Sequence, residues 1–278
     1  MLTGPTRLAV WGDPISHSRS PRLHAAAYRE LGLDWEYGRR RVDDDGFARE
    51  VDGLDAAWRG LSLTMPLKHV AARSARTLDD DARLTGAVNT YLLPGDGPHG
   101  FNTDVAGLAR ALDEVGVRSP RRVRVLGAGA TATSAVVSAV RAGAGSVEVR
   151  ARRPEAAAAL VDLGRSMGVE VTVRPLDDDR PHTVDATIAA LPGGTDLGVL
   201  AGVLASASGP LVDVVYGGWP TPLAQAWGGA GVAAHDGLGM LLHQALLQVR
   251  VFVGGDPARA LEREHEVLSA MRIAVVGD

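Results

Sequence analysis

Lysine is the rarest charged residue type in this chain. Of the 29 basic residues, only Lys68 is a lysine, in the stretch LSLTMPLKH, and all the others are arginines. Arginine stays protonated in proteins, whereas lysine can give and take a proton near neutral pH in a suitable environment. A solvated surface lysine in a chain biased toward arginine is the ordinary alternative. Lys68 is therefore a candidate for proton transfer.

Asparagine is almost as scarce as lysine. Asn89, in GAVNTY, and Asn102, in GFNTDVAG, both stand in Asn-Thr pairs after expected strands. Rare amide side chains in such settings indicate a specific hydrogen-bonding site. For Asn102, directly before an expected helix, a capping role explains the residue well. That explanation is weaker for Asn89, which lies inside an apolar strand pattern.

A glycine-rich turn near the middle of the chain has the spacing of a nucleotide-binding loop. The stretch VRVLGAGATA runs from an expected strand through Gly127 and Gly129 to Ala132 and then into an expected helix. In this pattern the first glycine makes the tight turn, the second admits the pyrophosphate, and the small third residue lets helix and strand pack closely. The phosphates would lie at the helix N-terminus.

The next expected strand, SVEVRARRP, indicates which dinucleotide would bind. An NAD site needs an acidic residue at the end of this strand, and an NADP site needs an arginine. The strand ends in Arg152 and Arg153, whereas Glu148 lies in mid-strand, about three residues too early. Because cations at a helix N-terminus oppose the helix dipole, a purely structural role explains the two arginines poorly. The sequence favours NADP.

Strands alternate with helices along the chain, which predicts an α/β protein with parallel sheets. The expected strands are 8–12, 35–42, 61–64, 88–93, 122–126, 146–151, 170–173, 185–190 and 211–215. The expected helices are 21–31, 46–58, 104–116, 130–142, 154–166, 237–253 and 256–272. Ser20 is the expected cap of the first helix, with Pro21 at its first position.

The composition is that of an ordinary soluble globular protein. The 278 residues are 46% hydrophobic and carry a net charge of −4, so no positive field argues for nucleic acid. We expect no membrane span, since no apolar run is long enough, and no signal peptide. The chain has no cysteine and its histidines lack a ligand spacing, so we expect no metal. A cytoplasmic location is the default expectation, and the oligomeric state stays open, with a homodimer among the alternatives.

Seven ordered motifs resemble those of the shikimate dehydrogenase family, which also includes quinate dehydrogenases. In chain order they are WGDPISHSRSPRLH, SLTMPLK, GAVNT, NTDVAG, GAGATATSA, DVVYGGWPTPL and GLGMLLHQA. The resemblance implies a substrate domain made of residues 1–103 and 237–278. It places a Rossmann-like NADP-binding domain at 104–236. The implied reaction is the reversible, NADP-dependent reduction of 3-dehydroshikimate to shikimate, on the route to chorismate and the aromatic amino acids.

The resemblance also implies residue roles. Lys68 would exchange the proton with the reacting oxygen, and Asp104 would orient it, although Asp104 could also be a helix cap. The implied substrate-binding residues are Ser18, Ser20, Ser62, Thr64, Asn89, Tyr216 and Gln244. The implied cofactor-binding residues are Gly127, Gly129, Ala130, Thr131, Ala132, Arg152, Arg153, Ala190, Gly237 and Met240. For Met240, a place in the core is an equal alternative.

Three departures from the family pattern leave alternatives open. Ser62 stands where the family usually has asparagine, Ala189–Leu191 stands in place of Asn-Ala-Thr, and Ala151–Arg153 in place of Asn-Arg-Thr. A quinate or related hydroxy-acid dehydrogenase is one alternative, because pocket residues such as Ser62 could decide the substrate. A regulatory protein that binds nucleotide or shikimate without turnover is the other. The retained Lys68 and Asp104 argue against a pure binder.

Overall fold

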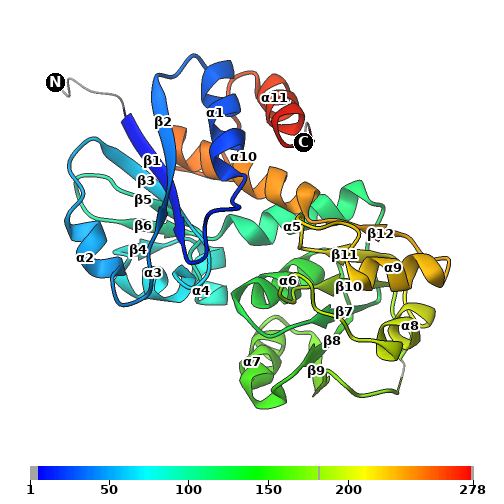
Figure 1. Cartoon of the computed structure of the whole chain (residues 1–278). Helices are drawn as coiled ribbons and strands as arrows, with labels where there is room; N and C mark the ends of the chain where they lie inside the picture. Colours follow the sequence, from blue (N-terminus) through cyan, green and yellow to red (C-terminus); the bar gives the residue numbers. More distant parts are fainter. Residues whose placement is uncertain (1–5, 181, 277–278) are drawn as a thin grey trace. The chain divides into compact units, whose positions relative to one another are not determined.

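The computed structural model describes residues 6–180 and 182–276, which form two compact units (Figure 1). One unit consists of Met1–Asp104 and Leu242–Asp278, and the other of Val105–Leu241. Each unit contains a six-stranded sheet accompanied by helices. The predicted α/β class is therefore confirmed. None of the described helices has the length and apolar character that a membrane span requires.

The sheet of the first unit is mixed. Its strands lie in the order β2-β1-β3-β5-β6-β4, with β1 parallel to β2 and β3, and β5 antiparallel to β3 and β6. The strands are β1 (Thr6–Gly12), β2 (Trp35–Arg41), β3 (Trp58–Leu63), β4 (Thr77–Leu78), β5 (Thr90–Leu92) and β6 (His99–Phe101). Apolar side chains of β1 and β3, with Phe47 and Tyr91, form a core on this sheet.

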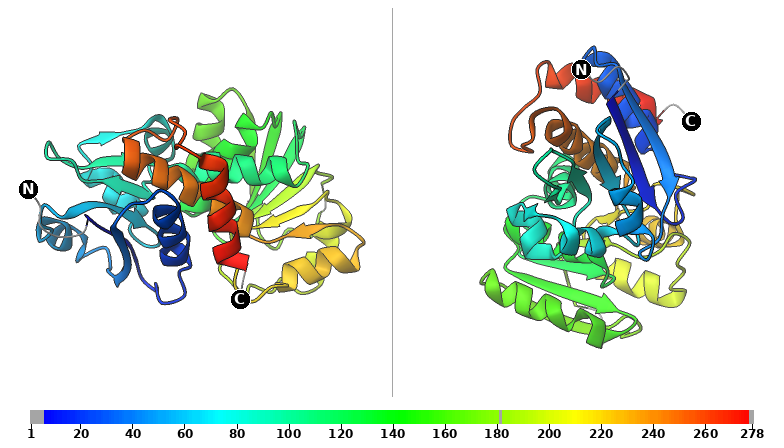
Figure 2. Two further views of the ribbon diagram at one scale, coloured as in Figure 1. Left: turned by 90° about the horizontal axis from the view of Figure 1, so that it is seen from above. Right: turned by 90° about the vertical axis from the view of Figure 1, so that its left-hand side faces the viewer.

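The helices of the first unit follow local signals in the sequence. They are α1 (Ser20–Glu30), α2 (Phe47–Asp52), α3 (Lys68–Ser74), α4 (Asp80–Thr85) and α11 (Glu264–Val276). Asp79 caps α4 by accepting a hydrogen bond from the backbone N–H of Ala82 at 2.7 Å. Gly86 ends α4 with φ 62°, a conformation that favours glycine. Helices α1 and α11 pack side by side (Figure 2).

The sheet of the second unit is parallel throughout and has the doubly wound order of dinucleotide-binding folds. The order is β12-β11-β10-β7-β8-β9. The strands are β7 (Arg122–Leu126), β8 (Ser146–Ala151), β9 (Glu170–Pro175), β10 (Ala186–Ala189), β11 (Leu211–Asp213) and β12 (Ala234–His235). This confirms the expected Rossmann-like sheet.

Helices connect most of these parallel strands. They are α6 (Ala130–Arg141), the 3₁₀ turn η1 (Pro154–Ala157), α7 (Ala158–Ser166), α8 (Val199–Ser206) and α9 (Pro222–Gly229). The connection from β9 to β10 differs, since its described residues are turns and irregular backbone. Two longer helices, α5 (Thr103–Glu114) and α10 (Leu238–Gly254), each contribute residues to both units.

Several sequence-based expectations need correction. The helix expected over 46–58 ends at Asp52, because Gly53 stops it, and the last helix begins at Glu264 instead of 256. Ser20 is the first residue of α1 and Arg19 is its N-cap, so the expected Ser20 cap is wrong. Helices α3, α4, α8 and α9 were not expected, since they are short and weakly periodic.

Candidate active site

Lys68 and Asp104 form an ion pair in the first unit. Lys68 is the first residue of α3 and Asp104 lies in the first turn of α5. The Lys68 Nζ donates to Asp104 Oδ2 at 2.6 Å, and the two side chains are 12% and 7% exposed. Such charge-assisted bonds are short and strong. The pair is therefore held in a fixed geometry, and the Lys68 side chain is not completely buried.

Asn89 holds the other oxygen of the Asp104 carboxylate. The Asn89 Nδ2 donates to Asp104 Oδ1 at 2.8 Å, while Asn89 Oδ1 accepts from the backbone N–H of Thr103 at 2.9 Å. Because a backbone N–H can only donate, this second bond fixes the orientation of the amide. The Gln244 Oε1 lies 3.5 Å from Asn89 Nδ2. The structure thus gathers Lys68, Asn89, Asp104 and Gln244 in one cluster.

Asn102 performs the capping role that the sequence allowed for it. Its Oδ1 accepts from the backbone N–H of Asp104 at 3.0 Å, and its Nδ2 donates to Thr85 Oγ1 at 2.8 Å. The cap of α5 is therefore Asn102 and not Asp104, which corrects the alternative considered for Asp104. The Asp104 carboxylate is left for Lys68 and Asn89, at a helix end where negative charge is favourable.

The predicted serine and threonine residues lie around the start of α1 and the end of β3. The Ser18 Oγ accepts from the backbone N–H of Ser20 at 3.3 Å. Ser62 is 3% exposed and hydrogen-bonds to Tyr37 and Gln248. Thr64 follows β3 and donates its backbone N–H to the Trp11 carbonyl. Sequence reasoning missed Tyr37 and Gln248, although Gln248 lies one helical turn after Gln244.

His24 and Tyr37 pack together behind the start of α1. Their rings stack with centroids 3.9 Å apart, and His24 Nδ1 is 3.0 Å from the Ser20 carbonyl. Burial lowers the pKa of His24 to about 4, a shift that the hydrogen bond with Ser20 partly opposes. Burial raises the pKa of Tyr37, against hydrogen bonds with Ser62 and Ser20 that lower it. Both side chains are neutral at pH 7.

The buried His24 predicts a loss of stability in mild acid. Its folded-state pKa lies below the ordinary 6.5, so the unfolded chain binds the proton more readily. The contribution of neutral His24 to the free energy of unfolding is therefore fully present above pH 6.5. It is lost as the pH falls through about 4, by on the order of 3 kcal/mol. Urea unfolding across this range should show a smaller loss for His24→Asn than for the wild type. His265→Asn, an exposed change on α11, is the control and should follow the wild type. An identical pH dependence for His24→Asn would contradict the assignment.

The glycine-rich turn of the second unit connects β7 to α6. Gly127 has φ 116°, and a Cβ there would lie 2.5 Å from the Ala190 carbonyl oxygen, so only glycine fits. A Cβ on Gly129 would meet no atom within 4 Å, so this residue faces open space. Ala132 is fully buried against the core. A tight turn, an open second glycine and a helix N-terminus fit the phosphates of a dinucleotide.

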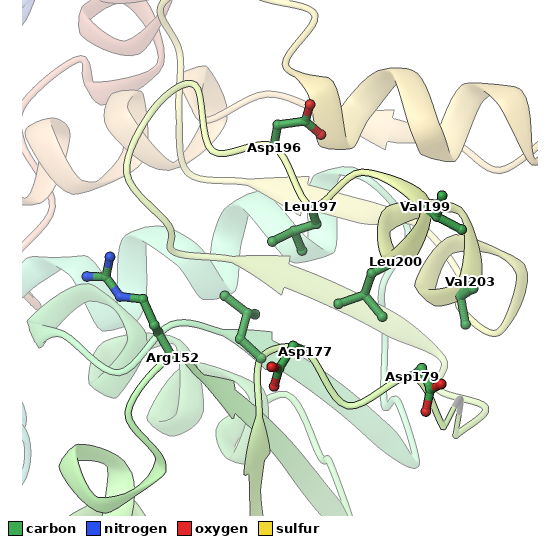
Figure 3. Close-up of a pocket in the computed structure, with 9 residues that line it drawn as sticks. Arg152, Asp177, Asp179, Asp196, Leu197, Val199, Leu200 and Val203 are labelled. Atoms are coloured by element: carbon green, nitrogen blue, oxygen red, sulfur yellow. The ribbon is translucent and has the colours of Figure 1, made fainter.

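A pocket of about 570 Å³ lies beside the end of β8 (Figure 3). Arg152 contributes to its wall, and Arg153, the next residue in the chain, is exposed. The remaining lining is formed by Leu176, Asp177, Asp179, Asp196, Leu197, Val199, Leu200 and Val203. The five apolar side chains and the arginine after the second strand fit the adenosine part of NADP, and three carboxylates complete the lining.

Glu148 has a role that the sequence did not reveal. It is 3% exposed, and its Oε1 accepts from Arg124 Nε at 2.7 Å and Arg150 Nε at 2.8 Å, both on fully buried arginines. His182 Nδ1 lies 2.7 Å from Glu148 Oε2. Burial raises the pKa of Glu148, but the hydrogen bonds from the arginines lower it to about 2. Glu148 is thus the centre of a buried ion cluster.

The other predicted residues lie in the second unit. Tyr216 follows β11, and Ala190 follows β10 with its N–H bonded to the Leu126 carbonyl. A Cβ on Gly237 would lie 2.1 Å from the Val214 carbonyl oxygen, which requires glycine there. Met240 is 6% exposed within the hydrophobic core of this unit, which supports the core alternative. Ala130 and Thr131 form the first turn of α6.

Comparison with known proteins identifies the family. The family described as "Shikimate dehydrogenase substrate binding domain" matches residues 10–91. The NADP-dependent shikimate dehydrogenase of Geobacter metallireducens is 33% identical, over 98% of this chain and 99% of its own length. The structure of Mycobacterium tuberculosis shikimate dehydrogenase has TM-score 0.86 and 38% identity, covering 99% of this chain and all of that one (100%). The Thermus thermophilus shikimate 5-dehydrogenase, solved with NADP(H) and shikimate, has TM-score 0.80 and 30% identity, covering 96% of this chain and 99% of its own. The chain therefore belongs to the shikimate dehydrogenase family.

Proposed function

We propose that this protein is an NADP-dependent oxidoreductase that reversibly reduces 3-dehydroshikimate to shikimate. The observation that carries the proposal is the Lys68–Asp104 pair, with Nζ 2.6 Å from Oδ2, in a chain of this family. The pair places one proton donor in a polar cluster that can hold a small hydroxylated acid. The product leads toward chorismate and the aromatic amino acids.

Each residue of the cluster has a part in this reaction. Lys68 gives a proton to the substrate oxygen as the carbonyl is reduced, and takes it back in the reverse direction. Asp104 orients the ammonium, and Asn89 holds the Asp104 carboxylate in place. The hydroxyl and carboxylate groups of the substrate are bound by Ser18, Ser20, Thr64 and Gln244.

The second unit supplies the nucleotide site. NADP, when bound, supplies or accepts the hydride, so the protein contributes position and a single proton. Gly127, Gly129 and the first turn of α6 would hold the pyrophosphate. Arg152 and Arg153 would hold the 2′-phosphate. The family pattern assigns residues 104–236 to NADP and residues 1–103 with 237–278 to the substrate, whereas the two compact units divide after Asp104 and after Leu241. In this proposal Tyr216 binds the substrate, and Ala190 and Gly237 bind the cofactor, while Met240 belongs to the core.

Turnover measurements distinguish the proposal from its alternatives. The wild type is assayed by the absorbance of the reduced nicotinamide, with shikimate or quinate and with NADP or NAD. Turnover of shikimate with NADP, at a kcat/KM at least about tenfold above every other pair, is expected. Preferred turnover of quinate would instead identify a quinate dehydrogenase. Binding of NADP and shikimate without turnover would identify a non-catalytic regulatory protein.

We also propose a cytoplasmic enzyme that forms a homodimer. The chain has no cysteine, so its stability does not depend on an oxidising compartment. Ile273 and Val276, three residues apart on α11, are 74% and 63% exposed, and association of two copies would bury such apolar side chains. Cell fractionation and sedimentation velocity test these two statements.

A further inference from the structure

A second polar network lies behind Asn89, buried in the first unit. The Tyr37 hydroxyl donates to Ser62 Oγ at 2.6 Å, and Ser62 Oγ donates to Gln248 Oε1 at 2.8 Å. Gln248 Nε2 in turn donates to the backbone carbonyl of Asn89 at 3.0 Å. Ser62 and Gln248 are 3% and 2% exposed, so solvent does not replace these bonds. The network connects β2, β3 and α10 to the residue that holds Asp104.

The direction of every bond in this network follows from one carbonyl group. The Asn89 carbonyl can only accept, so Gln248 must turn its amide N–H₂ toward it. The Gln248 Oε1, which can also only accept, then faces Ser62. The Ser62 proton must therefore point at Gln248. Since that proton is committed, the bond with Tyr37 must be donated by the phenol.

The remaining capacity of Ser62 is one lone pair. A serine hydroxyl has one proton and two lone pairs. The proton is on the bond to Gln248, and one lone pair accepts from Tyr37. Ser62 can therefore accept one further hydrogen bond but cannot donate one.

We propose that Gln248 is a positioning residue that fixes Ser62 as a hydrogen-bond acceptor, so that the site selects a substrate with a hydroxyl group facing Ser62. The inference rests on the proposed function, because it concerns the ring hydroxyls of the hydroxy acid. A hydroxyl can donate to the Ser62 lone pair, whereas a fluorine or a carbonyl oxygen at the same place cannot. By resemblance to the family, Ser62 is only a shorter residue in the place of asparagine, and whether it donates or accepts is not determined.

The test compares shikimate with analogues in which one of the two non-reacting ring hydroxyls is replaced by fluorine. Fluorine is close to a hydroxyl in size but lacks the proton. For one of the two analogues, the wild type should show kcat/KM lower by about tenfold, the effect of one lost hydrogen bond. In Gln248→Met the Ser62 proton is free to turn toward the ligand and to donate to the fluorine, so the ratio between shikimate and that analogue should fall, although the lone pair that accepts from the hydroxyl is kept.

Three further variants make the result specific. Tyr37→Phe keeps the bond from Ser62 to Gln248, so its preference for the hydroxyl should persist. Gln225→Met, an exposed change in the second unit, should match the wild type. Ser62→Ala removes the acceptor itself and should lose the preference, which provides a second test if Gln248→Met does not fold.

The possible outcomes separate this inference from the proposed function. A purely structural role for Gln248 would lower kcat/KM for shikimate and both analogues by the same factor. An unchanged ratio in Gln248→Met and Ser62→Ala, with shikimate still turned over, would overturn the inference alone. The inference alone would also be overturned if the wild type discriminated against neither analogue. Absence of shikimate turnover by the wild type would overturn both the inference and the proposed function.

Discussion

Replacing Lys68 by arginine is expected to lower kcat by about 10²–10⁴-fold, the usual contribution of a positioned acid or base. Arginine keeps the positive charge and the donors that Asp104 accepts, so the ion pair and the fold should persist. It does not release its proton near neutral pH, so the exchange with the substrate oxygen fails. The KM for shikimate should change by less than about fivefold, because charge and hydrogen bonding are retained. Steady-state kinetics in both directions of the reaction separate the effect on kcat from the effect on KM.

A matched control separates the proton from the charge. Arg73 is exposed on the same helix, α3, and Arg73→Lys introduces a lysine outside the cluster. This variant should keep the wild-type kcat, and an Arg73→Lys, Lys68→Arg double variant should be as slow as Lys68→Arg. NADP affinity and the thermal midpoint, measured on all variants, should stay constant. A Lys68→Arg enzyme within about threefold of the wild-type kcat would show that another group moves the proton.

The sequence predicted the parts of the fold that have long, regular patterns. The strand and helix around the GAGATA loop were predicted within one or two residues, because a buried strand, a glycine turn and an alanine-rich helix leave few alternatives. Helix α11 was misplaced by about eight residues, since the polar stretch after Asp256 also has a helix-like composition. The short helices α3 and α4 depend on tertiary packing that no local pattern records.

The candidate site was predictable where residue types are rare and not where they are common. Lys68 and Asn89 stand out because the chain uses almost no other lysine or asparagine. Gln248 gave no such signal, since a glutamine on an apolar helix usually faces solvent. Its role comes from bonds to Ser62 and Asn89, residues more than 150 positions away in the chain. Such bonds are visible only after folding.

The ion cluster of the second unit shows the same limit. In β7, RVRVL, arginines alternate with valines, a pattern that is typical of a strand with one face in solvent. Instead Arg124 is fully buried, and it donates to carbonyl groups of both the β9–β10 connection and α8, the latter at Leu204. Arg124 donates to the His182 carbonyl at 2.5 Å, and Arg150 donates to the Arg180 carbonyl at 2.8 Å. The buried guanidinium groups therefore donate hydrogen bonds to backbone carbonyls of the loop. In a helix, such carbonyls would accept from the helix's own N–H groups.

Glu148→Gln is expected to lower the free energy of unfolding by about 3–5 kcal/mol, because it leaves two buried arginines without their counter-charge. The thermal midpoint should fall on the order of 10 °C. Glu155→Gln, an exposed change in the same unit, should have almost no effect. A loss below about 1 kcal/mol for Glu148→Gln would show that the cluster contributes little. Thermal and urea unfolding of the three proteins provide the measurement.

The lowered pKa of Glu148 predicts how the stability of the second unit changes in acid. Its folded-state pKa of about 2 lies below the ordinary 4.5, so the stabilisation is fully present above pH 4.5 and is lost as the pH falls through about 2. Glu148→Gln has no such proton to bind, so the difference in stability between it and the wild type should shrink over this range. A difference that stays constant from neutral pH to about pH 2 would contradict the lowered pKa.

The hydrogen bonds from Arg124 and Arg150 to backbone carbonyls determine whether apolar side chains could replace the cluster. In many proteins a buried ion pair can be exchanged for hydrophobic residues with little loss, because desolvation of the charges is avoided. Here Arg124 and Arg150 also bind backbone carbonyls of the β9–β10 connection, including that of His182. Changing Glu148 to leucine and both arginines to methionine would leave those carbonyls without donors, at about 1–3 kcal/mol each. We therefore expect the triple variant to be no more stable than Glu148→Gln, and recovery of wild-type stability would show that the carbonyl bonds are dispensable.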